Sequence, residues 1–500
     1  MIGNKKIFLI FILIFGFVLR LFLVEEVPAG LYWDEAAMAL DAQSVAQTGR
    51  DHHGNHWLQP IYPSWGDYKL PGYILTAVPF FKVIKNNPQL AVRFPSLIAG
   101  SLTILVVYFF SREIFKDSLQ PLVSELVCLT ASFLLAVSPW HLQFSRAAFE
   151  ANLALLFNSL ALLFFYKAGK KKIYLILGLI TTLAGIYSYY SARIVLPAVL
   201  LLVFLFFWKK NFKNIAYFVL FLVLTALLCL PLRFSPLGPQ AEQFRLSAKN
   251  IFNNRQIINY SSKLIDQDGN NFWARKIHHR FLYQGKELAS HFFDHWSLNF
   301  LLLEGDSNLR HSTTRIGVLL VAAFIGLVYG QYLLFKKNKK LFIFLNLSLV
   351  LSFLPASVPY ETPHALRSLN GVFFVNIISG FGLLQLIKFL GEKKRVFCLL
   401  SLYLLIFIQF GLYLHDYYFH YPSRSLLAWQ GGYKQVVEVV NKEYPQAKKI
   451  IFTDFYHRPY LYFLLYSDYQ LKDFQTQRQE ELASRPLDYR ETKKIGKIEF

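Results

Sequence analysis

Long apolar runs separated by short polar segments dominate the chain. Eleven of these runs come close to the length of about 20 residues that crosses a bilayer as a helix. They are 7–24, 93–111, 121–138, 149–167, 173–188, 194–208, 214–232, 315–335, 341–356, 369–387 and 396–414. The pattern predicts an all-α polytopic membrane protein with 11 transmembrane helices. The run 7–24 lacks a small-residue cleavage site, so we expect it to be retained as the first helix.

A further apolar segment, 72–87, is short and carries Pro79, Lys82 and Lys85. If it lies flat on the membrane, alternate loops fall on one side and hold 19 Lys and Arg against three acids. If it spans the membrane, the lysine clusters of the later loops move outside. The positive-inside rule favours the first arrangement. We therefore predict an interfacial amphipathic helix at 72–87, a cytoplasmic N-terminus and an extracytoplasmic C-terminus.

This arrangement places three long segments outside, namely 25–92, 233–314 and 416–500. The last of them has patterns typical of a small α/β domain: helix 433–444, strand 449–454 and helix 458–466. Residues 1–415 then form the transmembrane part, and 416–500 form an extracytoplasmic extension.

The composition agrees with a membrane protein and argues against a nucleic-acid partner. Hydrophobic residues make up 54% of the 500 residues and charged residues 17%, whereas soluble proteins carry about 25% charged residues. The net charge of +21 lies largely in the short loops, because 424–500 holds 13 Lys and Arg against 10 Asp and Glu. The three cysteines lie far apart in apolar runs, which predicts neither disulfides nor a zinc site.

Ionisable residues that do not look like cytoplasmic anchors converge on the predicted outer face. Their groups are Asp34–Glu35, Asp67–Lys69, His141–Glu150, Tyr189–Arg193 and His364–Arg367. Ionisable groups near the ends of membrane helices are costly unless they are paired or wetted. Their convergence therefore predicts a functional site.

Asp34 and Glu35 are adjacent carboxylates that follow the first span and several aromatic residues. They can form an acidic helix N-terminus, which the helix dipole favours, or one of them can take the proton of an acceptor hydroxyl. Their position at the membrane edge favours the functional interpretation. Lys69 can bind a phosphate as a point charge or extend toward anionic lipid. Arg146 and Glu150 either pair across one helical turn or line the cavity that contains Asp34.

Three further groups are candidates for a metal site: the histidines of 52–56, His278–His279 and the acid pair Glu304/Asp306. The histidine spacing matches zinc sites poorly. An acid pair in a loop more often caps a helix or binds a nearby arginine. We predict no metal and no cofactor, and a metal at one of these groups stays the alternative.

Several segments together resemble the C-type (GT-C) membrane glycosyltransferases. They are WDEAAMALDAQ at 33–43, GDYKLPGYILTAVPFFKVI at 66–84, SPWHLQFSRAAFEANLA at 138–154, EGDSNLRHSTTRIGVL at 304–319 and PHALRSL at 363–369. Within this fold, the chain is most similar to bacterial protein O-mannosyltransferases and lipid A aminoarabinose transferases. The resemblance covers about residues 1–415.

The resemblance implies a polyprenyl-phosphate sugar donor, membrane lipids as surroundings and inverting transfer outside the cytoplasm. Asp34 would be the catalytic base, and Glu35 would support its loop or orient the acceptor. Lys69 would bind the donor phosphate, although Tyr68 replaces the Glu that usually precedes this lysine. The further substrate-binding candidates are Asp67, Arg146, Glu150, Arg193, His364 and Arg367.

Two other functions compete with this one. A lipid-linked sugar transporter or flippase would be expected to carry charges near the bilayer midplane and to have repeated halves, neither of which is visible here. A glycan polymerase or ligase with a diphosphate-linked donor would be favoured by a metal at Glu304/Asp306. We place the protein in a bacterial plasma membrane, with a lipid, glycan or protein as acceptor and an unspecified sugar.

Overall fold

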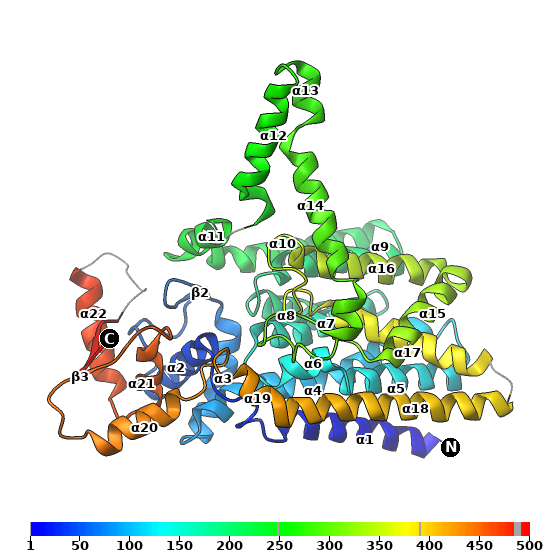
Figure 1. Cartoon of the computed structure of the whole chain (residues 1–500). Helices are drawn as coiled ribbons and strands as arrows, with labels where there is room; N and C mark the ends of the chain where they lie inside the picture. The colour runs from blue at the N-terminus through cyan, green and yellow to red at the C-terminus, as the bar shows by residue number, and fades with distance from the viewer. Residues whose placement is uncertain (1, 248–249, 390–391, 485–491) are drawn as a thin grey trace.

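A computed structural model describes residues 2–247, 250–389, 392–484 and 492–500 of the chain. Each apolar run falls on a helix of the main bundle. These helices are α1 (Ile2–Leu21), α4 (Pro88–Phe115), α5 (Pro121–Ala136), α7 (Glu150–Ala168), α8 (Tyr174–Ile186), α9 (Ala192–Phe207), α10 (Phe212–Phe234), α15 (Val321–Lys337), α16 (Lys339–Phe353), α17 (Gly371–Phe389) and α18 (Glu392–His415). Helices α1, α4, α5 and α18 run in roughly the same direction (Figure 1).

The predicted number of spans is 11, and the structure supports several of them by length and composition. Within the described residues, six helices are long and apolar enough to cross a membrane. A seventh is obtained if α5 and α6 (Pro139–Ser145), which meet at a 58° bend, count as one span. Helices α8 and α9 are apolar but shorter. The protein is a multi-pass membrane protein, and the full count of 11 stays a prediction.

Small residues let the central helices approach closely. A Cβ atom on Gly326 of α15 would collide with the carbonyl oxygen of Ser379 in α17, and one on Gly330 would collide with that of Ile378. Two glycines four residues apart thus form one face of α15, as is common where membrane helices pack through their backbones.

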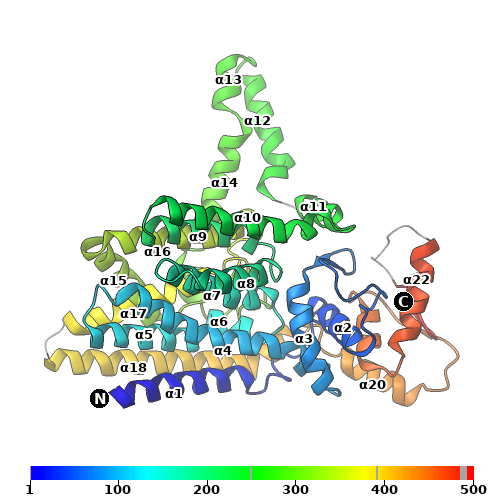
Figure 2. The same ribbon diagram turned by 180° about the vertical axis from the view of Figure 1, so that it is seen from behind.

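One end of the bundle carries α2 (Trp33–Thr48), α3 (Pro71–Val83) and the hairpin of β1 (Tyr62–Pro63) and β2 (Tyr68–Lys69). We call it the α2 end. Helix α3 has 13 residues, contains Pro79 and packs beside α2 and α4 (Figure 2). It is not among the helices that could span a membrane, which agrees with the interfacial helix expected at 72–87.

The C-terminal part also lies at the α2 end (Figure 1). It comprises η4 (Asp416–His420), α19 (Tyr421–Ser425), α20 (Tyr433–Glu443), α21 (Pro459–Tyr466), α22 (Leu471–Ser484), β3 (Ile450–Ile451), β4 (Lys494–Ile495) and β5 (Ile498–Glu499). Strand β5 pairs in parallel with β3 and antiparallel with β4. The two expected helices and the strand are confirmed, although the strand is only two residues long.

A helical hairpin projects from the bundle (Figure 1). It is made of α12 (Arg255–Gln267), α13 (Phe272–Ile277) and α14 (Arg280–Asp294). The segments around it are α11 (Gly238–Ser247), η1 (Ile251–Asn253), η2 (Asn299–Leu303) and η3 (Leu354–Ala356). The sequence predicts only a long outer loop here.

Candidate functional site

The first turn of α2 presents Asp34 and Glu35 in two different directions. Tyr32 before the helix is extended and no side chain caps the N-terminus, so the two acids provide the negative charge that the helix dipole favours. Successive helical residues point about 100° apart. The Asp34 side chain is therefore 23% exposed while that of Glu35 is 0% exposed.

Lys69, at the end of β2, links two carboxylates. Its Nζ donates to Asp34 Oδ1 at 2.5 Å and to Asp67 Oδ2 at 2.9 Å. Asp67 Oδ1 in turn lies 3.2 Å from Arg245 Nη2 on α11. The four groups form an alternating row of charges, which we call the Lys69 cluster: Asp34, Lys69, Asp67 and Arg245.

The electrostatics of the cluster keep its central members charged. Burial opposes the charge on Lys69, but Asp34, Asp67 and Glu150 outweigh it and raise the pKa of the ammonium. Burial acts against Asp67 as well, yet Lys69 and Arg245 lower the pKa of its carboxyl overall. Lys69 is thus a fixed cation and Asp67 a fixed anion near neutral pH.

Glu150 begins α7 and lies beside the Lys69 cluster. It interacts electrostatically with Lys69, Asp34 and Asp67. No hydrogen bond or ion pair of its carboxylate occurs within the part of the chain that the structure describes. Its acid group is therefore available to a ligand in this region.

Arginines and tyrosines surround the Lys69 cluster. Arg193 and Arg245 lie over the ring of Tyr190, at 4.5 and 4.3 Å from its centre, and the hydroxyl of Tyr190 donates to the carbonyl of Tyr68 at 3.1 Å. Arg367 interacts with Tyr189, which also faces Arg245, Glu150 and Lys69.

Two of these arginines have free donors. Nε and Nη2 of Arg193 and Nη1 of Arg367 are buried and have no hydrogen-bond partner among the described residues. Buried donors without partners are uncommon in folded proteins. They supply positive charge and N–H groups that an anionic ligand can use.

Glu35 does not face this cluster. Its two oxygens accept hydrogen bonds from Nε and Nη2 of Arg93 at 3.2 and 3.1 Å, and Oε1 also accepts from the backbone N–H of Ala148 at 2.6 Å. Arg93 also donates to the carbonyls of Val24 and Pro28. Of the two roles expected for Glu35, this geometry fits support of the loop.

Arg146 has a place that neither sequence interpretation anticipates. It is completely buried, and its guanidinium donates to the carbonyls of Leu19, Arg20 and Val27. The carbonyls of Leu19 and Arg20 belong to the last turn of α1. No N–H group further along the helix is available to donate to carbonyls in a last turn. Arg146 thus fastens the end of α1 and forms no ion pair with Glu150.

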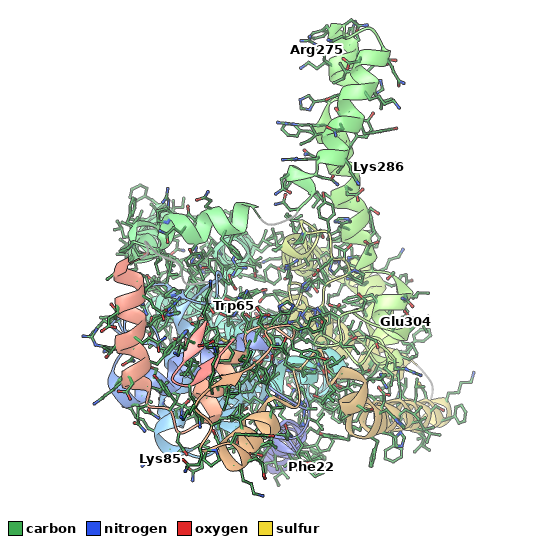
Figure 3. The ribbon with its side chains drawn as sticks, turned by 60° about the vertical axis from the view of Figure 1, so that its left-hand side comes forward. Phe22, Trp65, Lys85, Arg275, Lys286 and Glu304 are labelled. Atoms are coloured by element: carbon green, nitrogen blue, oxygen red, sulfur yellow. The ribbon has the colours of Figure 1, made fainter. Side chains whose placement is uncertain are left out.

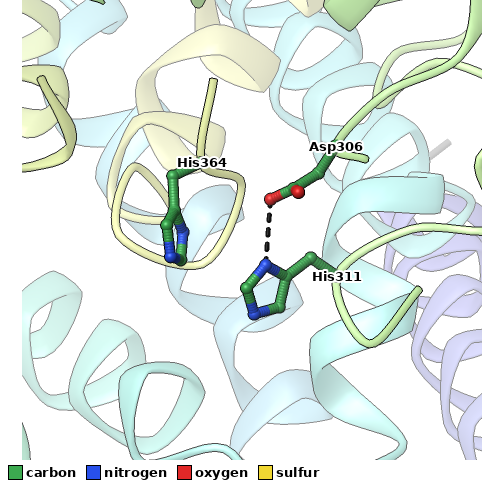
Figure 4. A group of neighbouring side chains, drawn as sticks. All are labelled: Asp306, His311 and His364. Carbon is green, nitrogen blue, oxygen red and sulfur yellow. Dashed lines mark hydrogen bonds and ion pairs between the residues drawn. The ribbon is translucent and has the colours of Figure 1, made fainter. Parts of the chain in front are cut away.

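His364 belongs to a neighbouring group of buried side chains, with Asp306 and His311 (Figure 4). Asp306 Oδ2 accepts hydrogen bonds from His311 Nδ1 at 2.9 Å and from the Ala365 N–H at 2.8 Å. Burial and the nearby His311 and Arg367 hold the pKa of His364 well below its usual range. His364 is therefore neutral, and its Nδ1 accepts a hydrogen bond from the backbone N–H of Arg367 at 3.3 Å.

This Asp306 group is the one cluster of three potential metal ligands within the described residues. Asp306 Oδ1 also accepts from the Asn308 N–H at 2.8 Å, so both carboxylate oxygens already have protein donors. Asp306 thus joins the loop of His311 to that of Ala365 through protein hydrogen bonds alone. Two imidazole nitrogens of the group are still available as metal ligands. Glu304 accepts a hydrogen bond from Asn299 and takes no part in the group.

The loop histidines are engaged in their own loops. His52 Nδ1 lies 2.5 Å from Asp41 Oδ1 on α2, and the tilted rings of His52 and His53 are 3.8 Å apart. His278 contacts Asp268 and Tyr283 within the projecting hairpin. Neither set joins a group of three ligands among the described residues.

Aromatic side chains lie close to Asp34 and Lys69, because Trp33 precedes Asp34 and Lys69 Nζ lies 5.9 Å from the centre of the Trp65 ring. Trp33 packs edge-on against Trp65 and His457. Arg310 lies 5.0 Å from the ring of Trp33, and Arg458 lies 4.9 Å from that of Trp65. Trp33 and Trp65 thus form a pair of large aromatic rings flanked by two arginines.

The sequence analysis did not identify four arginines as site residues, namely Arg245, Arg93, Arg310 and Arg458. Arg245 lies in a long loop whose helix α11 has no marked apolar pattern, so no signal placed it near Asp67. Arg93 offered a signal, since it is a charged residue at the start of an apolar run. Such a residue needs a partner, and Glu35 was a candidate.

The comparisons with known proteins agree with this architecture. Residues 71–232 match the family model of dolichyl-phosphate-mannose-protein mannosyltransferases. This region includes Glu150 and Arg193 but not Asp34, Asp67 or Lys69. No match was found among curated protein sequences.

Solved structures resemble the chain over nearly its whole length. An oligosaccharyltransferase from Archaeoglobus fulgidus, tethered with an acceptor peptide, is 14% identical with a TM-score of 0.57, covering 96% of this chain and 68% of that one. ArnT from Cupriavidus metallidurans is 10% identical in its apo state, with a TM-score of 0.52 and coverage of 92% and 84%. The same ArnT bound to undecaprenyl phosphate is 11% identical, with a TM-score of 0.50 and coverage of 95% and 89%.

These identities are low, so the likeness concerns the fold. The chain spans about two thirds of the archaeal enzyme's length, 66% in another of its structures. The oligosaccharyltransferase and ArnT are both GT-C glycosyltransferases. The chain therefore has the GT-C fold, and it resembles the glycosyltransferases that share this fold.

Proposed function

We propose that the protein is an inverting glycosyltransferase that moves a sugar from a polyprenyl-phosphate donor to an acceptor hydroxyl on the outer face of the membrane. The observation that carries the proposal is the shared hydrogen bonding of Lys69 by Asp34 and Asp67. This contact supports the proposal because it joins the candidate base, Asp34, to the candidate phosphate-binding cation, Lys69, at the α2 end of a membrane bundle.

The donor phosphate would bind among Lys69 and the arginines around it. A phosphate here would meet the charge of Lys69 and the free donors of Arg193 and Arg367, groups that stabilise a leaving phosphate as its charge develops. Undecaprenyl phosphate, the ligand in one of the ArnT structures, belongs to this chemical class. A phosphate that engages Lys69 would also release Oδ1 of Asp34 from its hydrogen bond.

Asp34 would then act as the general base. The acceptor oxygen attacks the anomeric carbon, its proton passes to Asp34, and the bond from that carbon to the phosphate oxygen breaks. The products are the glycosylated acceptor and the polyprenyl phosphate. Attack from the face opposite the leaving group inverts the anomeric centre.

Asp34 suits this role better than its neighbours. Asp67 is held between two cations and its side chain is only 10% exposed. Asp34 is more exposed and borders the tryptophan-lined side, where an acceptor would approach. Glu150 is the second acid, beside the donor position.

The decisive test is sugar transfer from synthetic radiolabelled polyprenyl-phosphate donors by the purified full chain. We expect donor turnover in the wild type and its loss in Asp34→Asn. The matched control is Glu26→Gln, an exposed carboxylate in the preceding loop, which should retain turnover. Undiminished turnover in Asp34→Asn would exclude Asp34 as the base.

The same assay separates the competing functions. Turnover only with a diphosphate-linked donor would favour a polymerase or ligase. Movement of intact donor across liposome membranes without cleavage would favour a flippase. Either result would overturn the proposed reaction.

A further inference from the structure

The projecting hairpin of residues 255–294, which we call the arm, is a built structure with a fixed base. The Ser261 hydroxyl donates to the carbonyl of His278, and Gln284 Nε2 donates to the carbonyl of Phe252 at 3.1 Å. At the base, the ring of His291 lies 3.0 Å from the carbonyl of Ser357, which follows α16 and η3. The arm is therefore held in one direction relative to the bundle.

One face of α14 is packed within the arm, and a second, apolar face is not. Gln284, Leu288 and His291 lie on the face that is buried or half-buried. Leu282, Ala289 and Phe293 are separated by 7 and 4 residues, so they share a second face. All three are exposed, with Phe293 at 66%.

The far end of the arm adds more exposed apolar side chains. Phe272, Trp273, Ile277 and Phe281 are each at least 60% exposed, and Trp273 reaches 70%. With Leu282, Ala289 and Phe293 they make up a series of exposed apolar side chains on α13 and α14, which we call the apolar series. Soluble surfaces rarely leave a series of this kind uncovered.

Basic residues accompany these apolar groups. Residues 272–286 contain Arg275, Lys276, Arg280 and Lys286 and no Asp or Glu. Arg275 lies at the far end of the arm and Lys286 nearer its base (Figure 3). Aromatic and basic residues in one amphipathic segment are typical of helices that lie in a membrane interface.

The direction of the arm relative to the bundle helices indicates how the arm lies relative to the membrane. The arm runs across the direction of the bundle helices rather than along it, and it projects from the bundle beside α11 (Figures 1 and 2). Because the bundle helices cross the bilayer along their own axes, a segment that runs across them extends along the membrane plane. Helix α11, which precedes the arm in the chain, also supplies Arg245 to the Lys69 cluster.

We propose that the arm lies in the lipid headgroup region of the leaflet on the α2 side. Its apolar series faces the acyl boundary, and Arg275, Lys276, Arg280 and Lys286 contact anionic headgroups. This contact fixes the depth of the α2 end against the membrane surface, and it does not depend on the proposed reaction.

The test uses the full chain in lipid nanodiscs that contain anionic lipid and lipids brominated near the top of the acyl chain. The emission of Trp273 is isolated as the difference between the wild type and Trp273→Phe. We expect brominated lipid to quench this emission strongly and aqueous iodide to quench it weakly. The matched control is Trp57→Phe, because Trp57 is 40% exposed on the loop before β1 and should show the reverse pattern.

Two results would overturn the proposal. One is a Trp273 signal that iodide quenches and brominated lipid does not, which would leave the apolar series to a partner protein. The other is lipid quenching that stays the same when Arg275, Lys276 and Arg280 are changed to Glu and when anionic lipid is omitted, which would remove the role of the basic residues.

Discussion

Asp34 and Glu35 are neighbours in the chain, yet they belong to opposite kinds of charged cluster. Glu35 and Arg93 are both completely buried and share two hydrogen bonds. Asp34 is partly exposed and shares Lys69 with a second acid, beside arginines that have free donors. One cluster is closed, and the other is open to a ligand.

The difference shows how buried charge can serve structure in one place and chemistry in another. A closed pair with every group satisfied holds parts of the chain together, and its loss leaves a buried charge without a partner. An open cluster has charges and donors in excess of what the fold uses. Substitutions should therefore separate the two by their effects on stability and on activity.

The largest effect is expected for Asp34→Asn. Loss of a positioned general base lowers rates by about 10²–10⁴-fold, while the fold should remain intact because Asp67 still pairs with Lys69. Initial rates with a saturating donor give the first quantity, and thermal unfolding in detergent gives the second. A large drop in unfolding temperature would place Asp34 with the structural residues instead.

Glu35→Ala should show the opposite pattern. Removing one partner of a buried pair leaves Arg93 uncompensated and destabilises a protein by roughly 3–5 kcal/mol. Thermal unfolding should register this loss. The double variant Glu35→Ala/Arg93→Met is the control, and it should recover part of the stability because it removes the unpaired charge.

Lys69→Met should lower activity somewhat less than Asp34→Asn, with a loss of about 10²–10³-fold, as is typical when one charge-stabilising group is removed. The loss arises from weaker stabilisation of the leaving phosphate. Lys82→Met is the matched control, since Lys82 is an exposed lysine of α3. Equal losses in the two variants would point to a general effect of surface charge on lipid binding.

Arg245 sharpens the same comparison. It holds Asp67 from the open side of the cluster, so Arg245→Met should raise the donor KM more than it lowers kcat. A change in kcat alone would argue for a role in the reaction step.

The sequence allowed the helical bundle and the convergence of Asp34, Lys69 and Glu150 to be predicted, but not the closed pairs. Apolar runs report burial along one helix, and each of the eleven runs falls on a helix. Asp34, Lys69 and Glu150 were predictable because charged residues at membrane edges are conspicuous. The positions of Arg146 and Glu35 depend on carbonyls and side chains that are distant in the sequence. The periodicity of apolar residues along one helix does not indicate such long-range contacts.

The helices of the arm could not be predicted from the sequence for a related reason. Its helices are short and polar on one side, so they resemble an ordinary loop beside the long membrane runs. The direction in which these helices project from the bundle distinguishes them from an ordinary loop, and that direction is visible only in the structure (Figure 1).

The open cluster should keep its charge over a wide pH range. Lys69 has a pKa raised above its ordinary value of 10.5, so its stabilising contribution is present below about 10.5 and is lost as pH rises through the folded-state pKa. Asp67 has a pKa lowered below 3.8, so its contribution is present above about 3.8 and is lost as pH falls through the folded-state pKa. The stability difference between Glu150→Gln and Glu150→Gln/Lys69→Met/Asp67→Asn, in which the neighbouring acid Glu150 cannot titrate, should therefore be constant from about pH 5 to 9. A difference that changes within this window would show that one of the two groups titrates there.

The smallest effect is expected for metal removal, and it separates the Lys69 cluster from the Asp306 group. If cations of the chain alone stabilise the leaving phosphate, EDTA should leave the transfer rate unchanged. Asp306→Asn should then lower the unfolding temperature, because Asp306 joins the loop of His311 to that of Ala365, while the rate in the folded fraction stays near the wild-type value. Loss of activity in EDTA that Mg²⁺, Mn²⁺ or Zn²⁺ restores, and that His311→Ala reproduces, would instead make the Asp306 group a metal site and would bring the diphosphate-linked donor forward. The two clusters would then share one reaction, with Lys69 at one phosphate and the metal at the other.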